Sequence, residues 1–93
     1  MIQSTKGKLA ANAVEDKFGK RFPSDLVKRT RAMLSAMDAA VVLEDLRFPP
    51  GNVLEALSGD RAGQHSVRIN DQWRICFIWT QEGPADVEIV DYH

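Results

Sequence analysis

The sequence predicts an α+β fold in which two to three N-terminal helices pack on one face of a roughly four-stranded antiparallel sheet. Apolar residues recur at helical intervals through the first half of the chain. The segment "RFPPGN" then ends helix formation, because two prolines and a glycine cannot continue a helix. Beyond it, apolar and polar residues alternate, as they do in half-buried strands. From a length of 93 residues we expect a single domain spanning 1–93.

The helical half divides into three expected helices. Residues 9–18, "LAANAVEDKF", carry apolar residues at helical spacing, and Gly19 is a natural C-terminal stop. A second helix follows Pro23 and Ser24, with a single stripe for burial made of Leu26, Thr30, Met33, Leu34 and Met37. Asp38 can cap a third, short helix. The inner face of that helix would be Ala39, Val42, Leu43 and Leu46.

The second half reads as a meander of strands. "VLEAL" is a short strand candidate, "GDRAG" is a loop, and "HSVRI" and "WRICFIW" both alternate. If all three residues of "NDQ" form the loop between them, Val67 faces Ile75 and Arg68 faces Arg74, so the apolar faces agree. A loop of two residues would break this match. "TQEGP" then turns the chain into "ADVEIVDYH", which places Val87 and Ile89 on the same apolar face.

This register sets Arg68 opposite Arg74 on the polar face of the sheet. Two like charges directly opposed across strands cost a few tenths to about 1 kcal/mol, so an anion should lie nearby. Glu88 on the last strand is one candidate. The other is a phosphate group, which guanidinium groups bind in a forked, bidentate geometry.

The terminal residues Asp91, Tyr92 and His93 follow an apolar run that should hold them near the sheet. Pairing Trp79 with Ala85 and continuing in register places Tyr92 on the face of Arg74. Asp91 and His93 would then point the other way, unless a bulge or bend brings all three together.

Composition excludes several classes of protein. No stretch approaches the roughly 18 apolar residues of a membrane span, and the first residues lack a secretory signal. A single cysteine, Cys76, excludes an intrachain disulfide and a metal site built on several cysteines. We therefore expect a cytoplasmic protein with no membrane partner.

Charge is divided unevenly along the chain. Residues 1–31 hold eight Lys and Arg against three acids, whereas residues 32–93 hold four against ten. Either these are two solvated faces of opposite sign, or the basic helices form a surface for phosphate.

One extended run carries a family resemblance. "PPGNVLEALSGDRAGQHSVRINDQWRICFIW", followed by "DVEIVDYH", closely resembles the HigB family of bacterial toxins in the RelE/ParE superfamily. The resemblance implies a RelE/ParE-like fold and a ribosome-dependent endoribonuclease that cuts mRNA during translation. It also implies neutralisation by a HigA-type helix-turn-helix antitoxin, with operator DNA bound only through that antitoxin. Arg74, Asp91, Tyr92 and His93 match active-site groups of the family.

Two positions depart from the family pattern. Well-studied members have a histidine where this chain has Glu55 and a lysine where it has Ser58. The change removes a proton carrier and a phosphate-binding cation. We expect either slower cleavage or a changed division of roles, with Glu55 acting as a general base. An equal alternative is that Glu55 is a surface acid with no catalytic role.

The implied reaction transfers the phosphodiester to the neighbouring ribose 2′-hydroxyl, and it needs a base, an acid and cations around the phosphate, with no metal or other cofactor. The expected catalytic residues are Arg74, Asp91, Tyr92, His93 and Glu55. The expected RNA-binding residues are Arg68, Arg61, Lys28 and Arg31. The basic helices, with Lys17, Lys20, Arg21 and Arg29 besides Lys28 and Arg31, would meet ribosomal RNA.

Two other functions stay open at this stage. The superfamily also includes toxins that inhibit DNA gyrase by binding it, without nuclease chemistry. The protein could instead act mainly as a corepressor that helps its antitoxin bind the operator.

Overall fold

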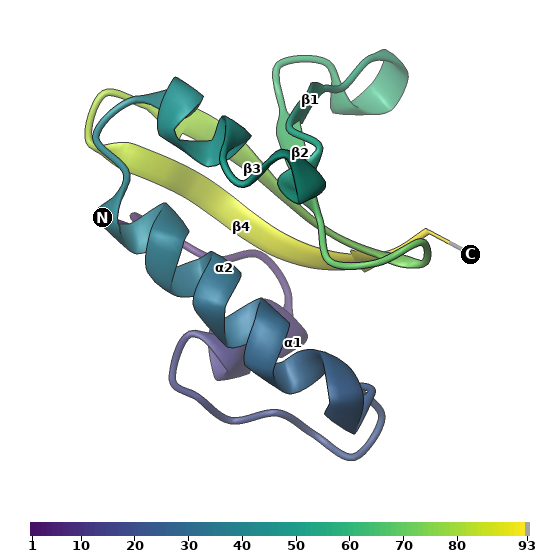
Figure 1. Ribbon diagram of the computed structural model, residues 1–93. Helices are drawn as coiled ribbons and strands as arrows, with labels where there is room; N and C mark the ends of the chain where they lie inside the picture. The colour runs from purple at the N-terminus through teal and green to yellow at the C-terminus, as the bar shows by residue number, and fades with distance from the viewer. Residues whose placement is uncertain (93) are drawn as a thin grey trace.

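The computed structural model describes residues 1–92 and confirms the α+β architecture. A four-stranded antiparallel sheet has its strands in sequence order, as the meander predicted. Figure 1 shows the sheet with the helices against it. The strands are β1 (Glu55–Ala56), β2 (His65–Arg68), β3 (Trp73–Thr80) and β4 (Gly83–Asp91).

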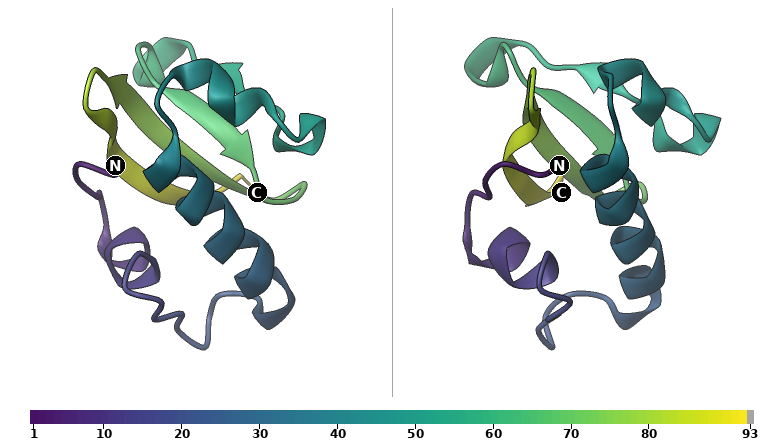
Figure 2. Two further views of the ribbon diagram at one scale, coloured as in Figure 1. Left: turned by 60° about the vertical axis from the view of Figure 1, so that its left-hand side comes forward. Right: turned by 90° about the vertical axis from the view of Figure 1, so that its left-hand side faces the viewer.

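Helix α2 (Val27–Ala39) lies along the sheet and buries the predicted stripe except Leu26, which precedes the helix and is only partly buried. A short 3-10 turn, Ser24–Leu26, leads into it after the proline. Turning the molecule shows α1 and α2 on the same side of the sheet (Figure 2). The buried side chains of α2 are Thr30, Met33, Leu34 and Met37.

Helix α1 (Lys8–Ala13) is shorter than expected, and the predicted stop at Gly19 is wrong. The chain leaves the helix early because Asp16 adopts a left-handed backbone conformation with φ of 62°. The N–H of Lys17 then donates to the carbonyl of Asn12 at 2.9 Å and closes the helix end.

The third expected helix is a 3-10 helix, Leu43–Arg47, and Asp38 does not cap it. Asp38 is still within α2, and its carboxylate accepts a hydrogen bond from the N–H of Ile2 at 2.8 Å. Asp45 serves as the cap instead, accepting from the backbone N–H groups of Val41 and Val42 at 2.9 and 3.1 Å. These bonds favour the carboxylate form and lower the pKa of Asp45.

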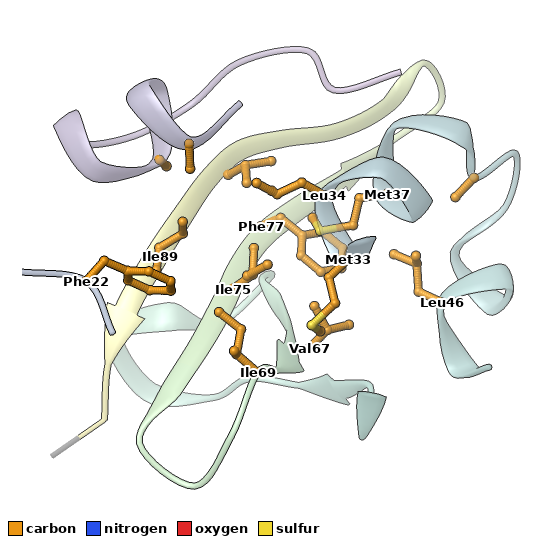
Figure 3. Close-up of a cluster of buried hydrophobic side chains, with 14 residues drawn as sticks. Phe22, Met33, Leu34, Met37, Leu46, Val67, Ile69, Ile75, Phe77 and Ile89 are labelled. Atoms are coloured by element: carbon orange, nitrogen blue, oxygen red, sulfur yellow. The ribbon is translucent and has the colours of Figure 1, made fainter. Parts of the chain in front are cut away.

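The core lies between α2 and one face of the sheet. Figure 3 shows side chains of α2 directed toward those of the central strands. Phe77 is fully buried at the centre, and Phe22 packs edge-on against Trp73 with ring centroids 5.1 Å apart. On the core face of the sheet and its hairpin, the buried residues are Val67, Ile69, Ile75, Phe77, Val87 and Ile89, which lie on the face that alternation predicted.

The register between β2 and β3 is the predicted one, with Val67 opposite Ile75 and Arg68 opposite Arg74. Ile69 donates its N–H to the carbonyl of Trp73 at 2.9 Å, which closes the hairpin.

The register between β3 and β4 contains a bulge that the sequence did not reveal. Trp79 pairs with Pro84 rather than with Ala85, and the register shifts between Cys76 and Ile78. Asp86 has a φ of 49°, and its N–H donates to the hydroxyl of Ser4 at 2.8 Å. The shift restores the expected pairing beyond the bulge, where Arg74 lies opposite Val90.

The turn between these strands is also tighter than "TQEGP" suggested. Thr80 pairs with Gly83, so only Gln81 and Glu82 form the loop.

The N-terminal segment covers the outer edge of β4. Thr5 forms a parallel bridge with Val87, and Lys6 donates its N–H to the carbonyl of Val87 at 2.9 Å. Backbone groups at this half of the edge are therefore paired rather than open to another strand. Within residues 1–92, neither helix is long and apolar enough to cross a membrane.

Candidate active site

The sheet face opposite the core carries a transverse row of polar residues, one from each strand. Glu55 pairs with Ser66, Ser66 with Cys76, and Cys76 with Glu88. Ser66 and Cys76 are both 0% exposed. We call these four residues the polar row: it has a small, buried floor and a carboxylate at each end.

Arg74 lies over one end of the polar row. Its Nη1 is 3.5 Å from Oε1 of Glu55 and donates to Oγ of Ser66 at 3.3 Å. The side chain of Arg74 is 19% exposed, so it is partly withdrawn from water. A half-buried guanidinium beside a carboxylate is suited to hold a phosphate group, with the carboxylate placed to accept a proton.

Arg68 and Arg74, which lie opposite each other, do not pair with Glu88 as expected. Arg68 forms an ion pair with Asp71 in the hairpin loop, and Arg74 pairs with Glu55. The expectation that Glu88 neutralises this pair is therefore wrong. The reason is that each arginine finds a closer acid, Arg68 within its own hairpin and Arg74 across β2.

Glu88 instead pairs with Arg61, at the other end of the polar row. Nη1 of Arg61 is 3.0 Å from Oε1 of Glu88 and 3.1 Å from Oε1 of Gln64. The hydrogen bond to Glu88 raises the pKa of Arg61 further, so this side chain stays charged.

Tyr92 lies on the face of Arg74, as the alternation predicted. The Arg74 guanidinium carbon is 5.4 Å from the centre of the Tyr92 ring, within the range of a cation–π contact. The Tyr92 hydroxyl lies 3.8 Å from Sγ of Cys76. Burial raises the pKa of the Tyr92 phenol, and the hydrogen bond with Cys76 adds to the effect.

The thiol of Cys76 faces this site rather than the core. Burial raises its pKa, while the hydrogen bond with Tyr92 and the charge of Arg61 act in the opposite direction. Cys76 is therefore a packed, protonated thiol beneath the tyrosine.

The remaining terminal residues are placed differently. Asp91 pairs with Trp73, one position from the pair of Arg74 and Val90, so alternation assigns it to the other face. His93 lies outside the described residues.

The predicted RNA-binding residues divide between two sides of the molecule. Arg61 and Arg68 lie on the polar-row face, whereas Lys28 and Arg31 lie on α2, in the other layer. Arg31 is held by Asp16 at 2.7 Å. Lys28 lines a separate groove of about 450 Å³ together with Pro49.

Arg29, one of the basic helix residues, has a structural contact of its own. Its guanidinium donates to the carbonyls of Ile69 and Arg68 at 2.7 and 3.0 Å and so ties α2 to the hairpin. The basic surface of α2 is thus partly used within the protein.

Sequence reasoning missed Ser66 and Gln64 as parts of the site. Ser66 shares the face of Arg68 by simple alternation, which could have identified it. Gln64 lies in a loop and carried no such signal. Across the described residues, no three His, Cys, Asp or Glu side chains come together in a way that could hold a metal ion.

Comparisons with known proteins show which family the chain belongs to. Residues 8–93 match the model of a family described as RelE-like toxins of the type II toxin–antitoxin system HigB. The chain is 38% identical to Toxin HigB-1 of Vibrio cholerae serotype O1 over 79 residues, covering 85% of this chain and 82% of that protein. It is 36% identical to an uncharacterized protein of Haemophilus influenzae over 62 residues, covering 67% and 59% of the two chains.

A solved structure shares the fold at low sequence identity. The YoeB–YefM complex from Staphylococcus aureus contains a chain that superposes with a TM-score of 0.59 and 17% identity, covering 100% of this chain and 98% of that one.

Proposed function

Because the chain belongs to the family of RelE-like HigB toxins of type II toxin–antitoxin systems, we propose that it is a ribosome-dependent endoribonuclease that cleaves mRNA during translation. The observation that carries the proposal is the cluster of Arg74, Glu55 and Tyr92 on one face of the sheet. A cation for the phosphate, a carboxylate and an aromatic ring for a base are the groups that this reaction needs.

The reaction begins when the ribose 2′-hydroxyl loses its proton and its oxygen attacks the adjacent phosphorus. The bond from phosphorus to the 5′-oxygen then breaks, and that oxygen takes up a proton, leaving a 2′,3′-cyclic phosphate. RNA alone can react in this way, since DNA lacks the 2′-hydroxyl.

Each residue has a role in this scheme. Glu55 accepts the proton of the 2′-hydroxyl, and Arg74 stabilises the negative charge that grows on the phosphate. Tyr92 stacks on a base next to the cleaved bond. His93 is assigned the proton for the 5′-oxygen, since an imidazole can donate near neutral pH. Asp91 is assigned the positioning of His93 or of the backbone around it.

The ribosome is assigned the task of presenting the message. The second half of the chain is acidic, so free RNA would be attracted weakly. Lys28 is assigned to ribosomal RNA together with Lys17, Lys20 and Arg21, in the helical layer rather than on the polar-row face. Arg31 can join them if it exchanges its partner Asp16 for a phosphate.

A HigA-type helix-turn-helix antitoxin is the proposed partner, and operator DNA is bound only through it. The match to a family of type II toxin–antitoxin toxins supports a protein antitoxin as the partner.

The test is to translate a defined message in vitro with this protein and map new 5′ ends. We expect cuts only when ribosomes are present, and none from a version lacking Tyr92 and His93. A parallel assay of DNA gyrase distinguishes the alternative. Intact message together with inhibited supercoiling would replace the nuclease with a gyrase-binding toxin.

A further inference from the structure

The guanidinium of Arg61 is held by two side chains, although it belongs to a loop. Arg61 closes a 3-10 turn, Gly59–Arg61, that carries the chain from β1 toward β2. Glu88 reaches it from β4 at 3.0 Å, and Gln64 reaches it from the loop just before β2 at 3.1 Å. The side chains of Arg61 and Glu88 are 31% and 26% exposed, so the pair lies at the boundary with water.

The two arginines of the site are arranged alike around the polar row. Each pairs with the carboxylate at one end of it, Arg74 with Glu55 and Arg61 with Glu88. Between these carboxylates the floor is formed by Ser66 and Cys76, which are small and buried. Two cations therefore flank a floor of buried, uncharged side chains.

Tyr92 is close enough to Arg61 and Arg74 for both positive charges to act on it. Its hydroxyl is 3.8 Å from Cys76, whose strand partner is Glu88, and its ring lies beside Arg74. The charges of Arg61 and Arg74 both act on the Tyr92 phenol and on the Cys76 thiol. Arg61 thus belongs to the same site as Arg74, although the two come from different parts of the chain.

The contacts to Glu88 and Gln64 use only one nitrogen of Arg61. Both are made by Nη1, and a guanidinium carries five N–H donors in a planar fork. A carboxylate that fixes one arm of the fork also orients the other arm. A salt bridge serving only to attach the loop would not need this orientation.

We propose that Glu88 is a positioning residue that fixes Arg61 as a second phosphate-binding cation beside Arg74. This inference rests on the proposed nuclease function and names a further residue for the same reaction. Arg61 binds a phosphate oxygen of the RNA strand, and Glu88 acts only through Arg61. The carboxylate at this end of the polar row takes no part in proton transfer.

The first experiment measures single-turnover cleavage on ribosomes with three variants. Glu88→Gln should lower the rate by up to about 10²-fold, the effect of displacing a positioned group by about 1 Å. Arg61→Lys should lower it at least about tenfold, because an ammonium group cannot make the forked contact. The exchange variant, Arg61→Glu with Glu88→Arg, restores the ion pair but moves the guanidinium to β4.

The exchange variant distinguishes two roles of the ion pair: orienting the guanidinium of Arg61, or only attaching the loop to the sheet. We expect its melting temperature to return toward that of the unmodified protein while cleavage stays low. Cleavage restored by the exchange would show that the pair only attaches the loop and would overturn the proposal. Unchanged cleavage in both single variants would overturn it as well, and this holds even if the exchange variant does not fold.

Matched controls use the same chemical changes at exposed positions. Glu82→Gln, in the turn between β3 and β4, and Arg47→Lys, at the end of the 3-10 helix, should leave cleavage unchanged.

The second experiment does not depend on cleavage. A trinucleotide with 2′-O-methyl groups cannot react, and its binding to the free protein can be followed through the side-chain N–H resonances of arginine. We expect the Arg61 signal to shift, and the shift to be reduced in Glu88→Gln. A shift at Arg74 without one at Arg61 would overturn the inference. If the Arg61 and Arg74 signals both shift but the protein never cuts message, Arg61 is still a second phosphate-binding cation, and the proposed nuclease function is rejected.

Discussion

Glu55 and Arg74 form an ion pair although their strands are not neighbours. Glu55 is on β1 and Arg74 on β3, and their side chains meet across Ser66 of the intervening strand at 3.5 Å. The contact is possible because Ser66 is small and its hydroxyl accepts a hydrogen bond from the same guanidinium nitrogen. The guanidinium of Arg74, the proposed phosphate-binding group, is therefore placed by residues from two other strands.

Glu55→Gln should lower single-turnover cleavage on ribosomes by about 10² to 10⁴, the usual contribution of a general base. The amide keeps the shape of the side chain and a hydrogen bond to Arg74 but cannot accept the proton. Glu55→Asp should retain part of the activity. Glu44→Gln, on the exposed surface, is the matched control.

A faster Glu55→Gln enzyme would contradict this role. It would mean that the carboxylate competes with the phosphate for Arg74 and restrains the toxin.

Arg74→Lys should lower the cleavage rate by about 10² to 10³, the cost of removing one donor to a developing negative charge. Lysine keeps the charge but has no planar fork, so it cannot contact Glu55, Ser66 and a phosphate together. Ribosome binding, measured by co-sedimentation, should change little. A rate within a factor of about two of the unmodified protein would exclude Arg74 from this role.

Tyr92→Phe and Tyr92→Ala should differ strongly in cleavage. Phenylalanine keeps the ring beside Arg74 and loses only the weak contact with Cys76, so its rate should stay close to that of the unmodified protein. Alanine also loses base stacking, which is worth about 1–3 kcal/mol per base, and should slow cleavage at least fivefold or so. Rates that are equal for the two variants and lower than that of the unmodified protein would show that the hydroxyl, not the ring, is needed. Two unchanged rates would exclude Tyr92 from the site.

Stability should fall in alkaline solution through Cys76. Burial raises the pKa of its thiol in the folded state. The unfolded chain therefore loses its proton first, from about pH 8.5 upward. The stabilisation is complete below that pH and is lost as the pH rises toward the folded pKa, with a slope of at most about 1.4 kcal/mol per pH unit.

Urea unfolding between pH 7.5 and about 9.5 measures this effect, and the range ends below the ordinary pKa of tyrosine. Cys76→Ser removes the titrating thiol and should flatten the profile. Parallel profiles for the two proteins would exclude Cys76 as the cause.

Phe77→Ala should destabilise the fold by about 3–5 kcal/mol, because it leaves a cavity in the centre of the core. Phe48→Ala provides the matched control, since Phe48 is 72% exposed and its loss should cost no more than about 0.5 kcal/mol. Denaturant unfolding of both variants tests the comparison. Similar losses would mean that the core is not centred on Phe77.

The sequence predicted the parts of the fold that depend on periodicity. Matching the apolar faces across the "NDQ" loop placed Arg68 opposite Arg74, because a slip of one residue would have turned a buried face toward water. The same reasoning placed Tyr92 on the face of Arg74. Burial of every second residue constrains such pairings strongly.

Contacts between segments distant in sequence could not be predicted in this way. The bulge near Asp86 depends on a positive φ at a residue other than glycine and on the hydroxyl of Ser4. The early end of α1 depends in the same way on Asp16. No periodic pattern records a left-handed backbone at a single aspartate.

The partners of the arginines were missed for a related reason. Alternation identifies the face on which a side chain lies, but not which acid on that face it reaches. Arg61 comes from a loop, so its contact with Glu88 has no register to predict it.

The polar row also has a consequence for the order in which the protein is made. Every strand supplies one member, and the last strand supplies both Glu88 and the approach to Tyr92. A growing chain that already contains Arg61 and Arg74 holds neither the acid that orients the first nor the ring that flanks the second. Under the proposed nuclease function, the site stays incomplete until β4 has emerged and joined the sheet, and the message on a ribosome making this protein would not be cut while the chain is unfinished.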